Sequence, residues 1–324
     1  MRADLHVHSD ASDGTDPPAE VMCRAAQVGL DVVALTDHDT VAGHAEARAA
    51  AGPVTLLPGM ELSCRLEHRG RGVPGGTKGS SPRGWQSLHL LAYLFDESQP
   101  ALAAELARIR DDRVLRARAM VDKLAGLGVD ISWEQVAAIA GPAVVGRPHI
   151  ARAMAASGAI ASPGEAFTRD WIADGGRAYV DRYALDPARA IGLIREAGGV
   201  AVLAHPRASR DTRVTDGQIA GLAAAGLAGV EVFHPDQPEA ERAGLLALAS
   251  GLSLVATGGS DDHGSLTGYR LGCETTPAEA YYALISRAVA SLCRDAHPNL
   301  TTGLLRPKLY LAPKAYRLPS WLPT

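Results

Sequence analysis

The sequence has few cysteines, and their spacing excludes the sites that paired cysteines build. Only four occur among 324 residues, Cys23, Cys64, Cys273 and Cys293, and none forms a C-x-x-C pair. A zinc ribbon needs such pairs and is excluded, and a disulfide framework is not expected in a chain of this length. We therefore interpret the cysteines as buried or incidental thiols of a protein from a reducing compartment.

The chain also lacks a long apolar run, a leader and a strong net charge. No stretch approaches the roughly 20 apolar residues that span a bilayer. The first residues, Met1–His6, show neither an apolar segment nor a cleavage-site pattern, so the cytoplasm is the predicted location. The formal net charge is −4. Nucleic acid could therefore bind only to a local patch, and neither membrane binding nor stable binding of a duplex is expected.

Short apolar runs recur instead, and they predict strands that are covered on both faces. The runs are Asp4–Val7, Val32–Thr36, Val54–Met60, Leu88–Leu94, Val200–Ala204, Val230–Phe233 and Leu252–Ala256. Helical patterns lie between several of them. One such helix begins at the Pro17-Pro18 pair and stops at Gly29. This alternation predicts an α/β fold with a parallel sheet, either open or closed into a barrel.

The middle of the chain interrupts the alternation with a long helical pattern. Apolar residues recur at helical intervals between Leu102 and Leu127, a capping box spans Ser132–Gln135, and further helices are predicted over 150–156 and 164–173. We predict an all-helical insertion into the α/β domain. The predicted boundaries are 1–99 for the first barrel segment, 100–188 for the insertion, 189–290 for the second barrel segment and 291–324 for a C-terminal tail.

Residues of metal-binding type follow the predicted strands. His6 and His8 alternate at the end of the first strand and therefore point to one side, and Asp13 follows in a turn. Alone, an H-x-H pair or a turn aspartate is more often structural than metal-binding. The other strands end in or carry Asp37-His38-Asp39, Glu61, His89, His205, Glu231 with His234, and Asp261-Asp262-His263.

The placement of these residues is more informative than any single motif. Each strand delivers a histidine, aspartate or glutamate at or near its carboxyl end, where barrel enzymes assemble their active sites. This placement favours a barrel over an open sheet, whose sites gather in one crevice. Imidazoles and carboxylates without cysteine suit Mn²⁺, Fe²⁺ or Zn²⁺. The candidate ligands outnumber what one ion uses, so two or three ions are predicted, an arrangement suited to displacement at phosphorus.

The order of these motifs resembles the PHP (polymerase and histidinol phosphatase) family over about residues 1–95 and 192–273. The resemblance implies a distorted (β/α)7 barrel with three metal ions. It is strongest to phosphoesterases with a helical insertion, which include nucleoside 3′,5′-bisphosphate phosphatases and 5′→3′ exoribonucleases acting on short RNA. By this resemblance His6, His8, Glu61 and Asp261 would hold one ion. Glu61, His89 and His205 would hold a second, and Asp13, His38 and His263 a third.

The same resemblance suggests roles beyond metal binding. The predicted catalytic residues are Asp13, Asp37, His38 and His263, with Asp37 as an orienter of its neighbours or a proton carrier. Arg147 and His149 resemble a family segment that clamps substrate phosphate, and arginine suits that task because its planar fork binds phosphate bidentately. A role in binding substrate phosphate, or in supporting the ligands, is also expected for His234. The predicted substrate is a phosphate ester of a nucleotide, either a small molecule or a short oligonucleotide.

Three other functions share some of these features. A histidinol-phosphate phosphatase would use the same ligands, a regulatory domain would bind metal without catalysis, and a deaminase-type amidohydrolase shares the H-x-H start. The filled ligand positions argue against a regulatory domain, and Glu61 argues against a deaminase. The basic, glycine-rich segment 65–84 is expected to be an exposed loop, and it is either merely solvated or a lid that draws in anionic substrates.

Overall fold

A single seven-stranded sheet that curls almost into a closed barrel forms the centre of the molecule. The computed structural model describes residues 1–67, 85–208 and 213–296, with side chains as far as residue 290. The strands lie in chain order: β1 (Ala3–Val7), β2 (Val32–Leu35), β3 (Thr55–Glu67), β4 (Trp85–Tyr93), β5 (Val200–Leu203), β6 (Gly229–Phe233) and β7 (Val255–Gly258). The two edges approach each other where Val7 forms a bridge with Asp262, just beyond β7. The predicted distorted barrel is therefore confirmed.

One strand runs against the prediction of a parallel sheet. Strand β4 is antiparallel to both β3 and β5, whereas all other pairs are parallel. The carboxyl end of β4 therefore lies away from the mouth of the barrel. His89 lies in the middle of β4 and pairs with Ser63, two residues beyond Glu61 on β3. The expectation that every strand delivers its polar residue at the carboxyl end is wrong for β4, although His89 still reaches the same mouth.

Several strand boundaries also differ from the sequence prediction, most of all the end of β3 and the beginnings of β4, at Trp85 instead of Leu88, and β7. Strand β3 continues to Glu67, so Arg65 belongs to a strand and not to an exposed loop. The rest of the predicted basic loop, residues 68–84, lies outside the described residues, as does the tail from residue 297. Strand β7 begins at Val255, because helix α8 continues through Gly251 and Leu252 caps it.

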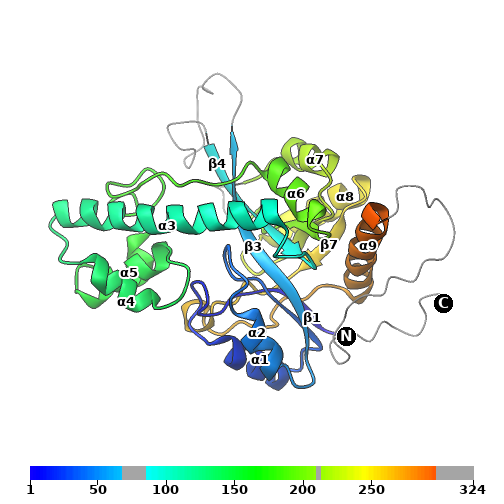
Figure 1. The fold of residues 1–324 in the computed structure, drawn as a ribbon, viewed down its shortest axis with the longest axis horizontal. Helices are drawn as coiled ribbons and strands as arrows, with labels where there is room; N and C mark the ends of the chain where they lie inside the picture. Colours follow the sequence, from blue (N-terminus) through cyan, green and yellow to red (C-terminus); the bar gives the residue numbers. More distant parts are fainter. Residues whose placement is uncertain (68–84, 209–212, 297–324) are drawn as a thin grey trace.

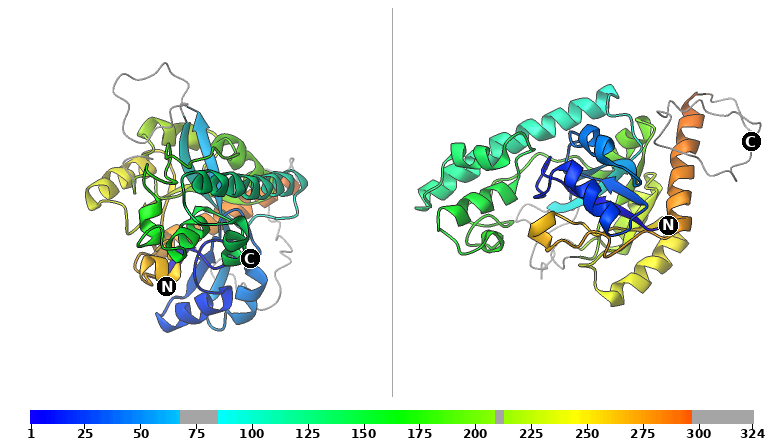
Figure 2. Two further views of the ribbon diagram at one scale, coloured as in Figure 1. Left: turned by 90° about the vertical axis from the view of Figure 1, so that its left-hand side faces the viewer. Right: turned by 90° about the horizontal axis from the view of Figure 1, so that it is seen from below.

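Helices lie around the sheet (Figures 1 and 2). Those that belong to the α/β segments are α1 (Pro18–Gln27), α2 (His44–Ala50), α6 (Pro187–Glu196), α7 (Asp216–Ala224), α8 (Glu239–Gly251) and α9 (Ala278–Ala296), with the short 3-10 turn η2 (Gly264–Thr267). Helix α1 starts with proline, as predicted, and Gly29 adopts a φ of +73° just beyond its end. Glycine is suited to this position because it enters the left-handed region without a steric penalty.

The predicted helical segment forms a lobe with a core of its own. It contains α3 (Pro100–Gly126), α4 (Trp133–Ala140), α5 (Arg147–Ala156) and the 3-10 turn η1 (Pro163–Ala166). The first half of α3 packs Leu102, Leu106 and Ile109 into the barrel core, whereas its second half packs Met120 and Leu124 into the core of the lobe. Figure 1 shows α3 extending from the barrel to the lobe. The continuous helix expected over 164–173 is wrong, since only η1 is helical there.

Unusual backbone conformations gather at the mouth of the barrel. His205 and Asp261 are predicted ligands with φ values of 27° and 50°, and Asp39, which follows His38, has a φ of 56°. Such conformations cost energy for residues other than glycine, and they are often found at functional sites. Among the described helices, none combines the length and the apolar character that a membrane crossing requires.

Candidate metal centre

The mouth of the barrel brings together the nine side chains that were predicted as metal ligands. They are His6 and His8 from β1, Asp13 and His38 from the loops after β1 and β2, Glu61 from β3, His89 from β4, His205 after β5, and Asp261 and His263 after β7. Segments that are far apart in the sequence meet here because their strands are neighbours in the curled sheet.

Glu61 lies at the centre of this group. Its Oε2 atom is 3.3 Å from His6 Nε2 and 3.1 Å from His8 Nε2. Its Oε1 atom is 2.8 Å from His89 Nδ1 and 3.0 Å from His205 Nε2. The two oxygens of one carboxylate therefore face different histidines, which is the arrangement that a bridging ligand requires.

The potential ligand atoms fall into overlapping sets. Those of His6, His8, Glu61 and Asp261 lie within 4.8 Å of one another, and so do those of His8, Asp13, His38 and His263. His38 connects two carboxylates, because its Nδ1 is 3.2 Å from Glu61 Oε2 and its Nε2 is 3.8 Å from Asp13 Oδ2. The site thus has the form of several adjoining ion positions rather than one isolated position.

Buried nitrogen atoms without hydrogen bonds test whether a metal fits these residues. Within the described part of the chain, His6 Nε2, both ring nitrogens of His8, His38 Nδ1 and His89 Nδ1 have no hydrogen-bond partner. Carboxylate oxygens are near, but the geometry of a hydrogen bond is not met. Buried polar atoms are normally satisfied, and leaving them unsatisfied is costly. Divalent cations would satisfy these nitrogens and the facing carboxylates together, so the residues present fit metal ions.

The histidines of the centre fall into two groups by protonation state, two with a lowered pKa and four with a raised pKa. Burial lowers the pKa of His38 to about 3 and also lowers the pKa of His89, so both imidazoles are neutral. Burial alone would raise the pKa of Glu61, but the surrounding histidines hold it well below its usual value. Burial also opposes the charged form of His8, but Asp261 and Glu61 outweigh it and raise the pKa of His8 to about 10. Neighbouring carboxylates likewise raise the pKa values of His6, His205 and His263. An arriving cation would therefore displace a proton from His8.

Asp37 supports the loop that carries Asp13. Its buried carboxylate accepts hydrogen bonds from the backbone N–H of Ser9 (2.8 Å) and from the hydroxyls of Ser9 (2.7 Å) and Ser12 (2.7 Å). The Ser12 hydroxyl also lies 3.2 Å from Asp13 Oδ1. These contacts favour the orienting role that was predicted for Asp37 over the role of proton carrier.

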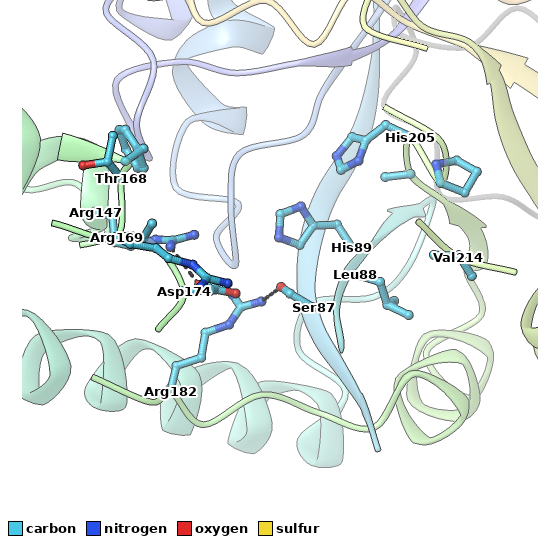
Figure 3. A pocket seen from close by; sticks show the side chains of 14 residues that line it. Ser87, Leu88, His89, Arg147, Thr168, Arg169, Asp174, Arg182, His205 and Val214 are labelled. Carbon is cyan, nitrogen blue, oxygen red and sulfur yellow. Dashed lines mark hydrogen bonds and ion pairs between the residues drawn. The ribbon is translucent and has the colours of Figure 1, made fainter. Parts of the chain in front are cut away.

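A pocket of about 410 Å³ opens beside His89 and His205, and arginines line its opposite wall (Figure 3). Arg147 was predicted from the sequence, whereas Arg169 and Arg182 were not, because no local pattern marks them. The Arg147 guanidinium pairs with Asp174 at 3.0 Å, and Arg182 donates to the Ser87 hydroxyl at 2.6 Å.

Positive charge accumulates behind this wall. Burial, Arg147 and Arg182 lower the pKa of the neighbouring Arg116 to about 9. Burial and Arg113 likewise lower the pKa of Arg182. The charged forms of Arg116 and Arg182 are thus disfavoured by burial and by neighbouring arginines, and an anion in the pocket would relieve that repulsion.

Two predicted phosphate-binding residues have contacts of another kind. His149 is 2% exposed, its Nδ1 accepts the backbone N–H of Gly146, and it does not line the pocket beside the metal ligands. His234 is 1% exposed, its Nδ1 accepts the N–H of Asp236, and its Nε2 lies 3.3 Å from Asp261 Oδ2. Neither ring reaches the pocket. The contacts of His149 are those of a residue that caps a helix, and the contacts of His234 are those of a residue that supports the predicted ligand Asp261.

Comparisons with known proteins agree with this geometry. Residues 4–115 match the PHP domain family. The chain is 34% identical over 263 residues to the 5′-3′ exoribonuclease of Haemophilus influenzae, covering 80% of this chain and 89% of that protein. It is 34% identical over 308 residues to the 3′,5′-nucleoside bisphosphate phosphatase of Chromobacterium violaceum, covering 94% of this chain and 98% of that protein. A structure from Bifidobacterium adolescentis, described as a metal-dependent phosphoesterase, superposes with a TM-score of 0.76 at 32% identity over 88% of this chain and 96% of that one.

Proposed function

Since the chain belongs to the PHP family of metal-dependent phosphoesterases, we propose that it hydrolyses nucleotide phosphate esters that carry a second anionic group. Adenosine 3′,5′-bisphosphate and 5′-phosphorylated short RNA are the substrates that we favour. The observation that carries this proposal is the pocket between the metal ligands His89 and His205 and the arginines of the opposite wall.

The charge of the centre supports two or three ions. Asp13, Glu61 and Asp261 are buried or largely buried, and the pKa of each is held well below its usual value by neighbouring histidines despite the opposing effect of burial. One divalent ion would leave these buried carboxylates incompletely neutralised, and uncompensated buried charge is costly. We propose the partition of ligands that the family resemblance implies, with His8 close enough to serve two positions. Mn²⁺, Fe²⁺ and Zn²⁺ are the candidate ions.

The side chains of the chain have complementary tasks in such a reaction. When bound, the ions would supply an activated water and neutralise charge on the phosphoryl oxygens. The Nδ1–H of His263 donates to the backbone oxygen of Asp261 (3.0 Å), which directs its Nε2 toward Asp13 Oδ1 at 3.4 Å. Asp13, whose carboxylate lies between His263 and His38, would help to hold the third ion.

Arginines of the pocket would hold the second anionic group. Arg147 and Arg169 come from the helical lobe, and Arg182 comes from the segment that returns to the barrel. Charge-assisted bonds from a guanidinium to phosphate are among the stronger hydrogen bonds in proteins. The same arginines disfavour histidinol phosphate, because its amine is cationic and would meet like charges. This contrast is the reason for our preference for nucleotides over the alternative substrate.

A small panel of substrates tests the proposal. Phosphate release with Mn²⁺ would be measured for adenosine 3′,5′-bisphosphate, 5′-AMP, histidinol phosphate and a 5′-phosphorylated short RNA, with a chelated control and Asp13→Ala. We expect turnover of the bisphosphate or the RNA that needs metal and is lost in the variant. Preferential turnover of histidinol phosphate would refute the choice of substrate.

A further inference from the structure

A buried glutamate outside the predicted ligand set touches two of its members. Glu231 lies on β6 and is 1% exposed. The Nδ1–H of His6 donates to its Oε1 at 3.0 Å, and the backbone N–H of His205 donates to its Oε2 at 2.8 Å. Both oxygens are therefore occupied by protein donors, so Glu231 is better placed to support ligands than to bind an ion itself.

The bond to His6 selects the ring nitrogen that faces the centre. With Nδ1 carrying the proton, Nε2 presents its lone pair, and it lies 3.3 Å from both Glu61 Oε2 and Asp261 Oδ1. This is also one of the buried nitrogens that has no hydrogen-bond partner in the described structure. A carboxylate behind a histidine is a common device that fixes the tautomer and the direction of a metal ligand.

The bond to His205 holds a strained segment of backbone. His205 has a φ of 27°, a conformation that residues other than glycine avoid, and Pro206 follows it. Its imidazole points at the other oxygen of Glu61, with Nε2 3.0 Å from Oε1. Glu231 thus fixes the backbone from which this second imidazole reaches the centre.

His6 and His205 face opposite oxygens of Glu61 and hence different ion positions. We propose that Glu231 is a positioning residue that braces both ligands with one carboxylate, so that loss of this brace weakens two ion positions together. The inference rests on the ligand set of the proposed function. It concerns binding of metal, however, and can be tested without any substrate.

Glu231→Gln is the decisive variant, because an amide has only one acceptor oxygen. The new side chain can accept from His6 or from the His205 N–H, but it cannot accept from both. Titration of metal-free protein with Mn²⁺ against a competing chelator, with metal counted by mass spectrometry, would give the affinity and the number of ions. We expect Mn²⁺ to bind at least about tenfold more weakly at two positions at once.

A matched control separates this effect from the general loss of a carboxylate. Glu274→Gln removes the same charge from a residue that pairs with Arg242 at 2.7 Å, away from the predicted ligands. It should leave the affinity and the visible absorption spectrum of the Co²⁺-loaded protein unchanged, whereas Glu231→Gln should alter both. Glu231→Asp keeps the charge but is too short to reach both donors at once, so its affinity should lie between those of the wild type and Glu231→Gln.

The possible results distinguish a failure of the role proposed for Glu231 from a failure of the proposed function. Unchanged Mn²⁺ binding in Glu231→Gln, or weakening at one position alone, would overturn the bracing role. If Glu231→Gln does not fold, as judged by circular dichroism, then Glu231→Asp decides, and full wild-type affinity in that variant would overturn the role as well. A wild-type protein that binds no divalent ion would contradict the proposed function itself.

Discussion

Replacement of Arg147 by methionine should separate substrates with one phosphate from substrates with two. Methionine keeps much of the length of the side chain but removes the guanidinium from the wall of the pocket. A hydrogen bond to a charged group contributes about 1.5–3 kcal/mol. The Arg147 side chain is 33% exposed and already pairs with Asp174 at 3.0 Å, so solvent and this competing carboxylate reduce the gain. We therefore expect a loss near the lower limit, about 1.4 kcal/mol or tenfold.

The assay compares kcat/KM for adenosine 3′,5′-bisphosphate with the values for 3′-AMP and 5′-AMP, with Mn²⁺ in excess. Arg147→Met should lower the value for the bisphosphate about tenfold, mainly through KM, and leave the monophosphates almost unchanged. Arg152→Met is the matched control, since Arg152 lies on the same helix α5 but lines a different pocket. Equal losses for all three substrates, or no loss for the bisphosphate, would refute the assignment of Arg147 to a second anion.

Three further predictions concern the framework of the site. Arg113→Met should lower the free energy of unfolding, measured in urea, by about 3–5 kcal/mol, because it leaves the fully buried Asp39 carboxylate without its charged partner. A decrease in the free energy of unfolding below about 1 kcal/mol would contradict this prediction. The apparent affinity for Mn²⁺ should rise about tenfold per pH unit between pH 6 and 8 for each proton displaced, because His8, with a pKa of about 10, must lose a proton when the ion binds. Calorimetry in buffers of different ionisation enthalpy would count the displaced protons. An affinity that does not change with pH would contradict this prediction. Gly259→Ala should reduce the bound metal, because a Cβ there would overlap the His6 side chain and lie 2.6 Å from its backbone nitrogen; full metal content in mass spectrometry would show that the strand can yield.

The residues that meet at the candidate metal centre were predictable because strand ends are visible in the sequence. His6 and His8, for example, close an apolar run, and alternation alone places both imidazoles on one side. The direction of β4 was not predictable, since an apolar run of this length looks the same in a parallel and an antiparallel strand. His89 was still found, because it is a histidine within an apolar run, and its pairing with Ser63 places it at the same mouth.

The residues that surround the ligands were harder to find, for a physical reason. Arg169 and Arg182 follow no local pattern, and they meet only because the helical lobe folds back over the barrel. Glu231 was visible as a polar residue in an apolar strand, but its contacts with His6 and His205 depend on the pairing of β5 with β6 and on the near closure of the barrel. For His234, three positions further on, the sequence left open a role at substrate phosphate or in support of the ligands, and the contact of its ring with Asp261 suits the second.

The central claim is that the buried imidazoles and carboxylates hold ions that make phosphoester hydrolysis possible. The most direct test strips the protein with a chelator, restores Mn²⁺ in steps and measures both the ions bound per chain and the phosphate released from adenosine 3′,5′-bisphosphate. We predict that the stripped protein is inactive, that activity appears only as two or more ions bind, and that Asp13→Ala stays inactive at any Mn²⁺ concentration. Full activity in the stripped protein, or in Asp13→Ala, would contradict the claim.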